Sequence, residues 1–267
     1  MSVDLFAVRS ILFLPASNPR AIAKARASAA DLVVLDLEDA VKPADKSAAR
    51  AAAVEAVSGG WPMPVAIRVN GFGTAWHDDD VAAVASSAAA IAVLPRTRSA
   101  REASAAREKL GKTLLAMVET AAGVLAAAEI AHEASALVAG TNDLSADLRL
   151  PPGAGRAPLQ TALQMIVLAA RAAGIAAFDG VFNRLDDAAG FVAEAAESRR
   201  LGFDGKSLIH PDQIAPCHSA FAPAEAELDR ARRLLEAATG GAERFEGEMV
   251  ERMHVEAARR LVERGRT

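Results

Sequence analysis

Eight short apolar runs recur along the chain, each followed by a segment of mixed or Ala-rich sequence. The runs lie at residues 10–14, 32–37, 65–69, 91–94, 114–118, 136–139, 176–178 and 207–209. Nearly all of them are continuous rather than alternating, which is typical of parallel strands buried on both faces. The segments between them, such as 19–30, 46–57, 100–110, 121–132 and 159–173, are long enough for helices. Eight strand-then-helix units in 267 residues predict an α/β fold, the (β/α)8 TIM barrel.

An open doubly wound sheet is the competing architecture, and it would carry a Gly-rich dinucleotide loop after the first strand. That loop here reads Pro15-Ala16-Ser17-Asn18-Pro19, which favours the barrel. After Pro211 the pattern changes to helices and loops, with a break at Gly240-Gly241. We therefore expect a TIM-barrel catalytic domain over residues 1–215 and a C-terminal helical extension over 216–267. The extension either caps the mouth of its own barrel or contacts a neighbouring subunit.

Composition excludes several classes of protein. Thirty basic and 34 acidic side chains give a formal charge of −4, so the chain lacks the excess positive charge that favours nucleic-acid binding. The single cysteine, Cys217, excludes an internal disulfide, and no apolar run approaches the roughly 20 residues of a membrane span. Without a secretory leader pattern at the N-terminus, we predict a cytoplasmic protein that acts on small molecules.

Polar residues follow the predicted strands, at the rim where TIM barrels place their catalytic groups. Any one of them alone could instead cap a helix, because Asp and Asn do so readily. Their joint placement around one mouth favours a site. The set comprises Asp36, Glu38, Asp39, Arg68, Asn70, Arg96, Glu119, Asn142, Asp143, Asp179 and His210.

Glu119 and Asp143 end neighbouring predicted strands, so their carboxylates are expected to converge. Two such charges about 4 Å apart repel by about 4 kcal/mol at an effective dielectric constant of 20, which a bound cation would relieve. Oxygen ligands without His or Cys favour Mg²⁺, and Mn²⁺ would also fit. The alternative is that each residue caps the helix that follows it.

Arg68 closes an apolar strand and should point into the mouth, where a guanidinium suits a substrate carboxylate or a developing enolate oxygen. It could instead pair structurally with Glu38 or Asp39. A Schiff-base aldolase is disfavoured, because the one lysine near a strand, Lys206, stands at the start of its run. A Gly-X-Ser-X-Gly nucleophile elbow does not occur, which disfavours a serine hydrolase.

The first predicted loop carries a weaker signal for phosphate binding. Ser17 or Asn18 can cap the helix that begins at Pro19, and Arg20 and Lys24 lie one turn apart. A helix N-terminus with two cations beside it can bind a phosphate.

The chain resembles the citrate lyase beta subunit-like family of acyl-CoA lyases, within the aldolase/citrate lyase superfamily. The matching stretches occur in the family's order and span about four-fifths of the chain. Asp-Leu-Glu-Asp-Ala-Val is the most specific. The stretches run over residues 9–15, 35–41, 67–70, 118–120, 140–144 and 205–211.

The resemblance implies a Mg²⁺-dependent TIM barrel, typically a homotrimer, that cleaves or forms a carbon–carbon bond in carboxylated 3-hydroxyacyl thioesters. Family Mg²⁺ ligands fall on Glu119 and Asp143, and the family's substrate arginine falls on Arg68. Glu38 and Asp39 match acids that orient metal-bound water.

The resemblance also extends to cofactor recognition and to the tail. Asn18, Arg20 and Lys24 match the region where malyl-type lyases hold CoA phosphates. Family lyases use a tail aspartate from the adjacent subunit as acid/base, in a sequence like Gly-Lys-Met-Ile-Asp followed shortly by Pro. Here Glu251 falls on the aspartate, and Met253 stands where proline is expected.

These observations predict a carbon–carbon lyase that acts on a citryl-, malyl- or citramalyl-CoA type thioester and releases an oxo acid and an acyl-CoA. One alternative is a beta subunit whose thioester rides on an acyl carrier protein. Another is the pyruvate-type class II aldolase branch, which shares the metal pair. A third is a barrel that binds metal and oxo acid without lyase turnover.

Overall fold

The computed structural model describes residues 3–265, and its first part is a closed barrel of eight parallel strands. The strands pair in sequence order, and β1 closes the barrel against β8. The predicted (β/α)8 barrel is therefore confirmed. The strands are β1 (Ser10–Pro15), β2 (Leu32–Asp36), β3 (Val65–Arg68), β4 (Ile91–Leu94), β5 (Thr113–Val118), β6 (Ala136–Ala139), β7 (Ala176–Asp179) and β8 (Gly205–Leu208).

Alternate residues of β1 to β7 fill the barrel interior with apolar side chains. Ile11, Val34, Leu115, Val138 and Phe178 belong to this core, all buried. The residues between them face the surrounding helices and are also buried, which is why the sequence shows continuous apolar runs.

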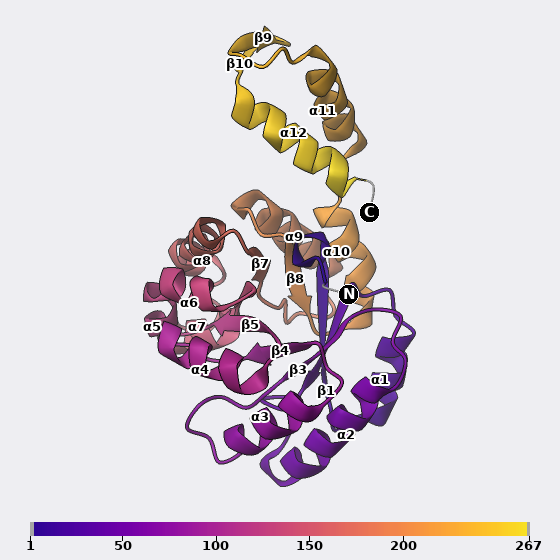
Figure 1. The fold of residues 1–267 in the computed structure, drawn as a ribbon, viewed down its shortest axis with the longest axis vertical. Coiled ribbons are helices and arrows are strands. Elements are labelled where there is room, and N and C mark those ends of the chain that lie inside the picture. The colour runs from indigo at the N-terminus through magenta and orange to yellow at the C-terminus, as the bar shows by residue number, and fades with distance from the viewer. Residues whose placement is uncertain (1–2, 266–267) are drawn as a thin grey trace. The chain divides into compact units, whose positions relative to one another are not determined.

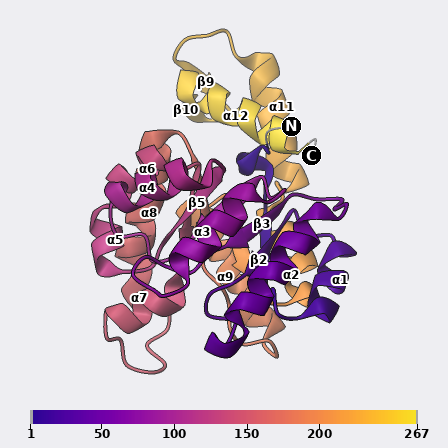
Figure 2. The same cartoon turned by 60° about the horizontal axis from the view of Figure 1, so that its bottom comes forward.

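Helices lie around the outside of the barrel (Figures 1 and 2). The predicted helix over 121–132 is two helices that meet at Ala126. Short 3-10 turns occur at Leu5–Ala7, Pro43–Asp45, Ala157–Leu159 and Pro211–Gln213. The helices are α1 (Pro19–Arg26), α2 (Lys46–Ser58), α3 (His77–Ser86), α4 (Ala100–Leu110), α5 (Ala121–Leu125), α6 (Ala127–Glu133), α7 (Thr141–Asp147), α8 (Gln160–Ala173), α9 (Ala188–Leu201) and α10 (Ile214–Phe221).

The chain divides into two compact units, the first ending at Ala220 and the second beginning at Phe221. The second contains α11 (Glu225–Ala237), the antiparallel hairpin of β9 (Glu243–Phe245) and β10 (Glu248–Val250), and α12 (Arg252–Arg264). Its small core includes Leu234, Val250 and Ala258. The sequence prediction placed the boundary at 215/216 and missed the hairpin, whose strands are only three residues long. Contact of this unit with a neighbouring subunit stays a prediction.

Within residues 3–265, the helices are all too short or too polar to cross a membrane.

Candidate functional site

A cavity of about 400 Å³ opens at the carboxyl ends of the barrel strands. Several of the predicted site residues line it together, from the ends of β2 and β3 and from the segments that follow β2, β5 and β6. Its polar wall includes Asp36, Asp39, Arg68, Glu119, Asn142 and Asp143.

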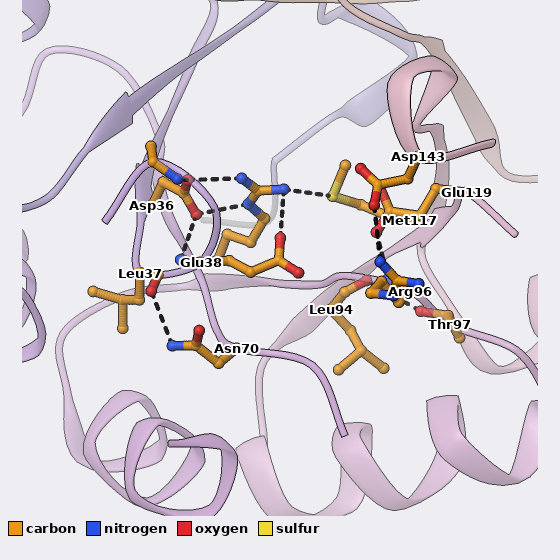
Figure 3. Close-up of polar contacts among 12 residues, drawn as sticks. Asp36, Leu37, Glu38, Asn70, Leu94, Arg96, Thr97, Met117, Glu119 and Asp143 are labelled. Carbon is orange, nitrogen blue, oxygen red and sulfur yellow. Dashed lines mark hydrogen bonds and ion pairs between the residues drawn. The ribbon is translucent and has the colours of Figure 1, made fainter. Parts of the chain in front are cut away.

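Arg68 reaches into the cavity from the last position of β3. Its Nε and Nη2 atoms donate hydrogen bonds to the two carboxylate oxygens of Asp36, both at 2.7 Å. Its Nη1 atom lies 2.7 Å from Glu38 Oε2 and 3.7 Å from Met117 Sδ. Figure 3 shows Asp36 and Glu38 around this guanidinium. Arg68 is thus both a cation in the cavity wall and an ion-pair partner of Glu38, with Asp36 as its main anchor.

Burial and charge act in opposite directions on these groups. Burial alone would lower the pKa of Arg68, but attraction by Asp36 and Glu38 holds that pKa above its usual value. The guanidinium therefore stays charged. Burial raises the pKa of Glu38 to about 8, although Arg68 opposes the rise.

Glu119 directly follows β5 and is 2% exposed. A side chain at Gly140, at the end of β6, would overlap the Glu119 carboxylate, so this position requires glycine. The main-chain N–H of Arg96 donates to Glu119 Oε1. Thr120, not Glu119, caps α5 by accepting a hydrogen bond from Gly123 N at 3.0 Å, so the capping alternative for Glu119 is wrong.

Asp143 lies in the first turn of α7, whose N-cap is Gly140. Its Oδ1 atom accepts a hydrogen bond from Arg96 Nη1 at 2.9 Å. Burial, together with repulsion from Asp39, raises the pKa of Asp143. Burial likewise raises the pKa of Glu119 to about 7, and Asp143 and Asp39 add repulsion. Figure 3 shows Arg96, Glu119 and Asp143 gathered in one group.

This donor set fits a hard divalent cation. Glu119 and Asp143 offer only oxygen atoms, and a cation between them would favour their ionised forms. No three His, Cys, Asp or Glu side chains within residues 3–265 form a metal-binding group by themselves. The remaining ligands would therefore be water or substrate oxygens, as Mg²⁺ commonly keeps.

Several predicted residues do not line this cavity, and Glu38 is one of them, although its carboxylate contacts Arg68. Asn18 caps α1, with its Oδ1 atom accepting a hydrogen bond from Ala21 N at 3.1 Å. Arg20 and Lys24 are exposed on the same helix. Glu251 is exposed at the N-cap of α12, in the second unit. Their roles in CoA binding and proton transfer stay predictions.

Asp179 was expected at the mouth, and this is wrong. It is fully buried and accepts hydrogen bonds from Lys206 Nζ at 2.8 Å and from Arg156 Nη2 at 2.9 Å, with Ser198 as a third donor. Lys206 does not stand at the start of β8 but is its second residue, and it also bonds to Glu194 of α9. This buried charge cluster joins the barrel wall to its outer helix.

Asn70 and His210 were also expected at the mouth, and neither lines the cavity. Asn70 is buried, where its amide donates to Asp80 Oδ2 at 2.6 Å and accepts from Lys46 Nζ at 2.6 Å. His210 caps the 3-10 turn that precedes α10, since its Nδ1 atom accepts a hydrogen bond from Asp212 N.

Two residues that the sequence placed on the rim without a role are central to the geometry. Asp36 anchors Arg68, and Arg96 contacts both Glu119 and Asp143. The signal for Asp36 was present, because it and Arg68 end neighbouring strands and pair in register.

Comparisons with known proteins match this architecture. The model of the HpcH/HpaI aldolase/citrate lyase family matches residues 9–211. A (3S)-malyl-CoA thioesterase of Cereibacter sphaeroides is 40% identical, covering 95% of this chain and 93% of the relative. Citrate lyase subunit beta of Escherichia coli is 34% identical, covering 96% and 92%. The crystal structure of CitE from Mycobacterium tuberculosis, in complex with magnesium, acetoacetate and coenzyme A, superposes with a TM-score of 0.87 at 36% identity, covering 98% of this chain and 100% of that one.

Proposed function

The chain belongs to the HpcH/HpaI aldolase/citrate lyase family, and we propose that it is a Mg²⁺-dependent carbon–carbon lyase. Its substrate would be a carboxylated 3-hydroxyacyl-CoA thioester of the citryl, malyl or citramalyl type, and its products an oxo acid and an acyl-CoA. The observation that carries the proposal is the juxtaposition of Glu119 and Asp143 in one cavity with Arg68. The Mycobacterium tuberculosis relative, whose crystal structure contains magnesium, acetoacetate and coenzyme A, supports it.

Glu119 and Asp143 would hold the metal ion. When bound, Mg²⁺ would act as a Lewis acid toward the substrate's carboxylate and hydroxyl oxygens. Glu38 and Asp39 would orient water beside it. Arg68, held charged by Asp36, would bind a substrate carboxylate and stabilise negative charge that develops in the reaction.

The bond between the carbinol carbon and the thioester α-carbon breaks as the hydroxyl proton passes to a water molecule that Glu38 and Asp39 would orient. The carbinol carbon becomes the carbonyl of the oxo acid, and the α-carbon keeps the electron pair as a thioester enolate. That enolate must take up a proton to become the acyl-CoA. We assign this step to Glu251 from a neighbouring subunit of a homotrimer, and CoA phosphate binding to Asn18, Arg20 and Lys24.

A screen of citryl-, malyl- and citramalyl-CoA, with Mg²⁺ present and with a chelator, tests the proposal. We expect the protein to release oxo acid and acyl-CoA in equal amounts, and only when the metal is present. Turnover of the carrier-protein thioester but not of the CoA thioester would identify a beta subunit that acts on an acyl carrier protein. Oxo-acid binding with no turnover of any thioester would leave only a binding role.

Thioester hydrolysis is the second candidate. The 40% identity to a (3S)-malyl-CoA thioesterase favours it. The same screen distinguishes the two, because hydrolysis releases free thiol without an oxo acid.

A further inference from the structure

Arg96 contacts both carboxylates of the proposed metal pair. It lies between β4 and α4, and its main-chain N–H donates to Glu119 Oε1 while its guanidinium donates to Asp143 Oδ1 at 2.9 Å. The two contacts come from different parts of one residue. The main chain fixes the position of Arg96 relative to Glu119, and the side chain then neutralises Asp143.

The backbone of Arg96 supports a fixed position. Its φ angle is +48°, a left-handed conformation that costs a non-glycine residue about 1 kcal/mol or more and persists only where surrounding contacts hold it. The hydrogen bond to buried Glu119 is one such contact. The side chain is 52% exposed, so the guanidinium can leave Asp143 without moving the backbone.

We propose that Arg96 competes with the divalent ion for Asp143 and turns to the substrate's anionic carboxylate when metal and oxo acid bind together. The inference rests on the proposed function, because it needs a cation at Glu119 and Asp143. A carboxylate that accepts a close guanidinium and a divalent ion at once places two like-signed charges side by side, which is unfavourable. A substrate carboxylate at the mouth offers the displaced guanidinium a new partner. Arg96 would thus be a positioning residue that makes metal binding depend on substrate.

Arg96→Gln is the informative variant, because it removes the charge and the long guanidinium arm but leaves a polar, unbranched side chain with the same backbone demand. Arg96→Gly is unsuitable, because glycine adopts a positive φ without strain and would change the backbone as well as the charge. Arg98→Gln is the matched control. Arg98 lies in the same loop with a 53% exposed side chain, but it pairs with Glu102 of α4.

The measurement is Mn²⁺ binding by electron paramagnetic resonance, with and without saturating pyruvate as the probe oxo acid. Without pyruvate, Arg96→Gln should bind Mn²⁺ about three- to fivefold more tightly than the unaltered protein, the equivalent of one half-exposed ion pair. With pyruvate this advantage should disappear, because the competition is already relieved. Arg98→Gln should match the unaltered protein in both conditions.

The inference is wrong if, without pyruvate, Arg96→Gln binds Mn²⁺ no more tightly than the unaltered protein does. It is also wrong if the advantage persists unchanged with pyruvate. If the unaltered protein binds no Mn²⁺, or if Glu119→Gln binds it equally well, the proposed function itself fails instead.

Discussion

Replacement of Asp36 by Asn tests whether the cavity depends on one buried anchor. All four hydrogen-bond partners of the Asp36 carboxylate are donors. They are Nε and Nη2 of Arg68, Glu38 N at 2.8 Å and Ala40 N at 3.0 Å. An asparagine keeps one acceptor oxygen but turns an NH₂ group toward two of these donors. Arg68 would then be left buried with Glu38 as its remaining ion-pair partner.

The expected loss of stability is large. Asp36 is 1% exposed and Arg68 is 9% exposed, and removal of one partner from a buried ion pair destabilises a protein by about 3 to 5 kcal/mol. For a domain of this size each kcal/mol lowers Tm by about 2–4 °C, so Tm should fall by roughly 6–20 °C. Activity should fall further, because a guanidinium displaced by about 1 Å can slow turnover about a hundredfold.

Asp31→Asn is the matched control. Asp31 also makes a two-bond ion pair, with Arg9. Arg9 immediately precedes β1 and Asp31 immediately precedes β2, so the pair lies at the opposite rim from the cavity. We expect Asp31→Asn to reduce stability and to leave kcat/KM unchanged at a temperature where both variants are folded. Thermal melting and turnover of the active CoA thioester provide the two readouts. If Asp36→Asn retains the kcat/KM of Asp31→Asn, then Asp36 does not position Arg68 for the reaction.

Three further predictions follow from the burial and placement of single groups. Burial raises the pKa of Glu119 to about 7 and that of Glu38 to about 8, from 4.5, so the fold favours their protonated forms. With a chelator present, the free energy of unfolding should therefore fall as the pH rises from about 4.5 to 8. Glu119→Gln should make this decrease smaller. A decrease as large as in the unaltered protein would show that Glu119 does not have a raised pKa. Ser207→Ala should stabilise the protein in urea unfolding by about 1 kcal/mol, since the buried Ser207 Oγ has no hydrogen-bond partner among the described residues, and a loss of stability would disprove this. Glu251→Gln should abolish thioester cleavage while pyruvate binding stays nearly intact, and an unchanged rate would remove Glu251 from the mechanism.

The barrel was predictable because burial on both faces leaves a continuous apolar run for each strand. Strands β4 and β6 match the prediction at both ends. Five other strands differ from the prediction by one residue at one end. The largest difference is in β8, which begins at Gly205 rather than at Ser207, because Gly205 and Lys206 are not apolar. Lys206 was misplaced for this reason. A buried lysine inside a strand is recognisable only once its partners Asp179 and Glu194 are known to lie beside it.

The same double burial limits what the sequence could say about the site. In β2, Val34 faces the barrel interior, so Asp36 two residues later faces it as well, beside Arg68. In β7, Phe178 faces the interior, so Asp179 one residue later turns outward to Lys206. An alternating strand would reveal this difference, because polar and apolar positions would mark the two faces. A strand that is apolar on both sides carries no such mark, so residues of both faces were expected around one mouth. The charged residue at the end of a barrel strand can be assigned to the cavity only after the inward positions of that strand are known.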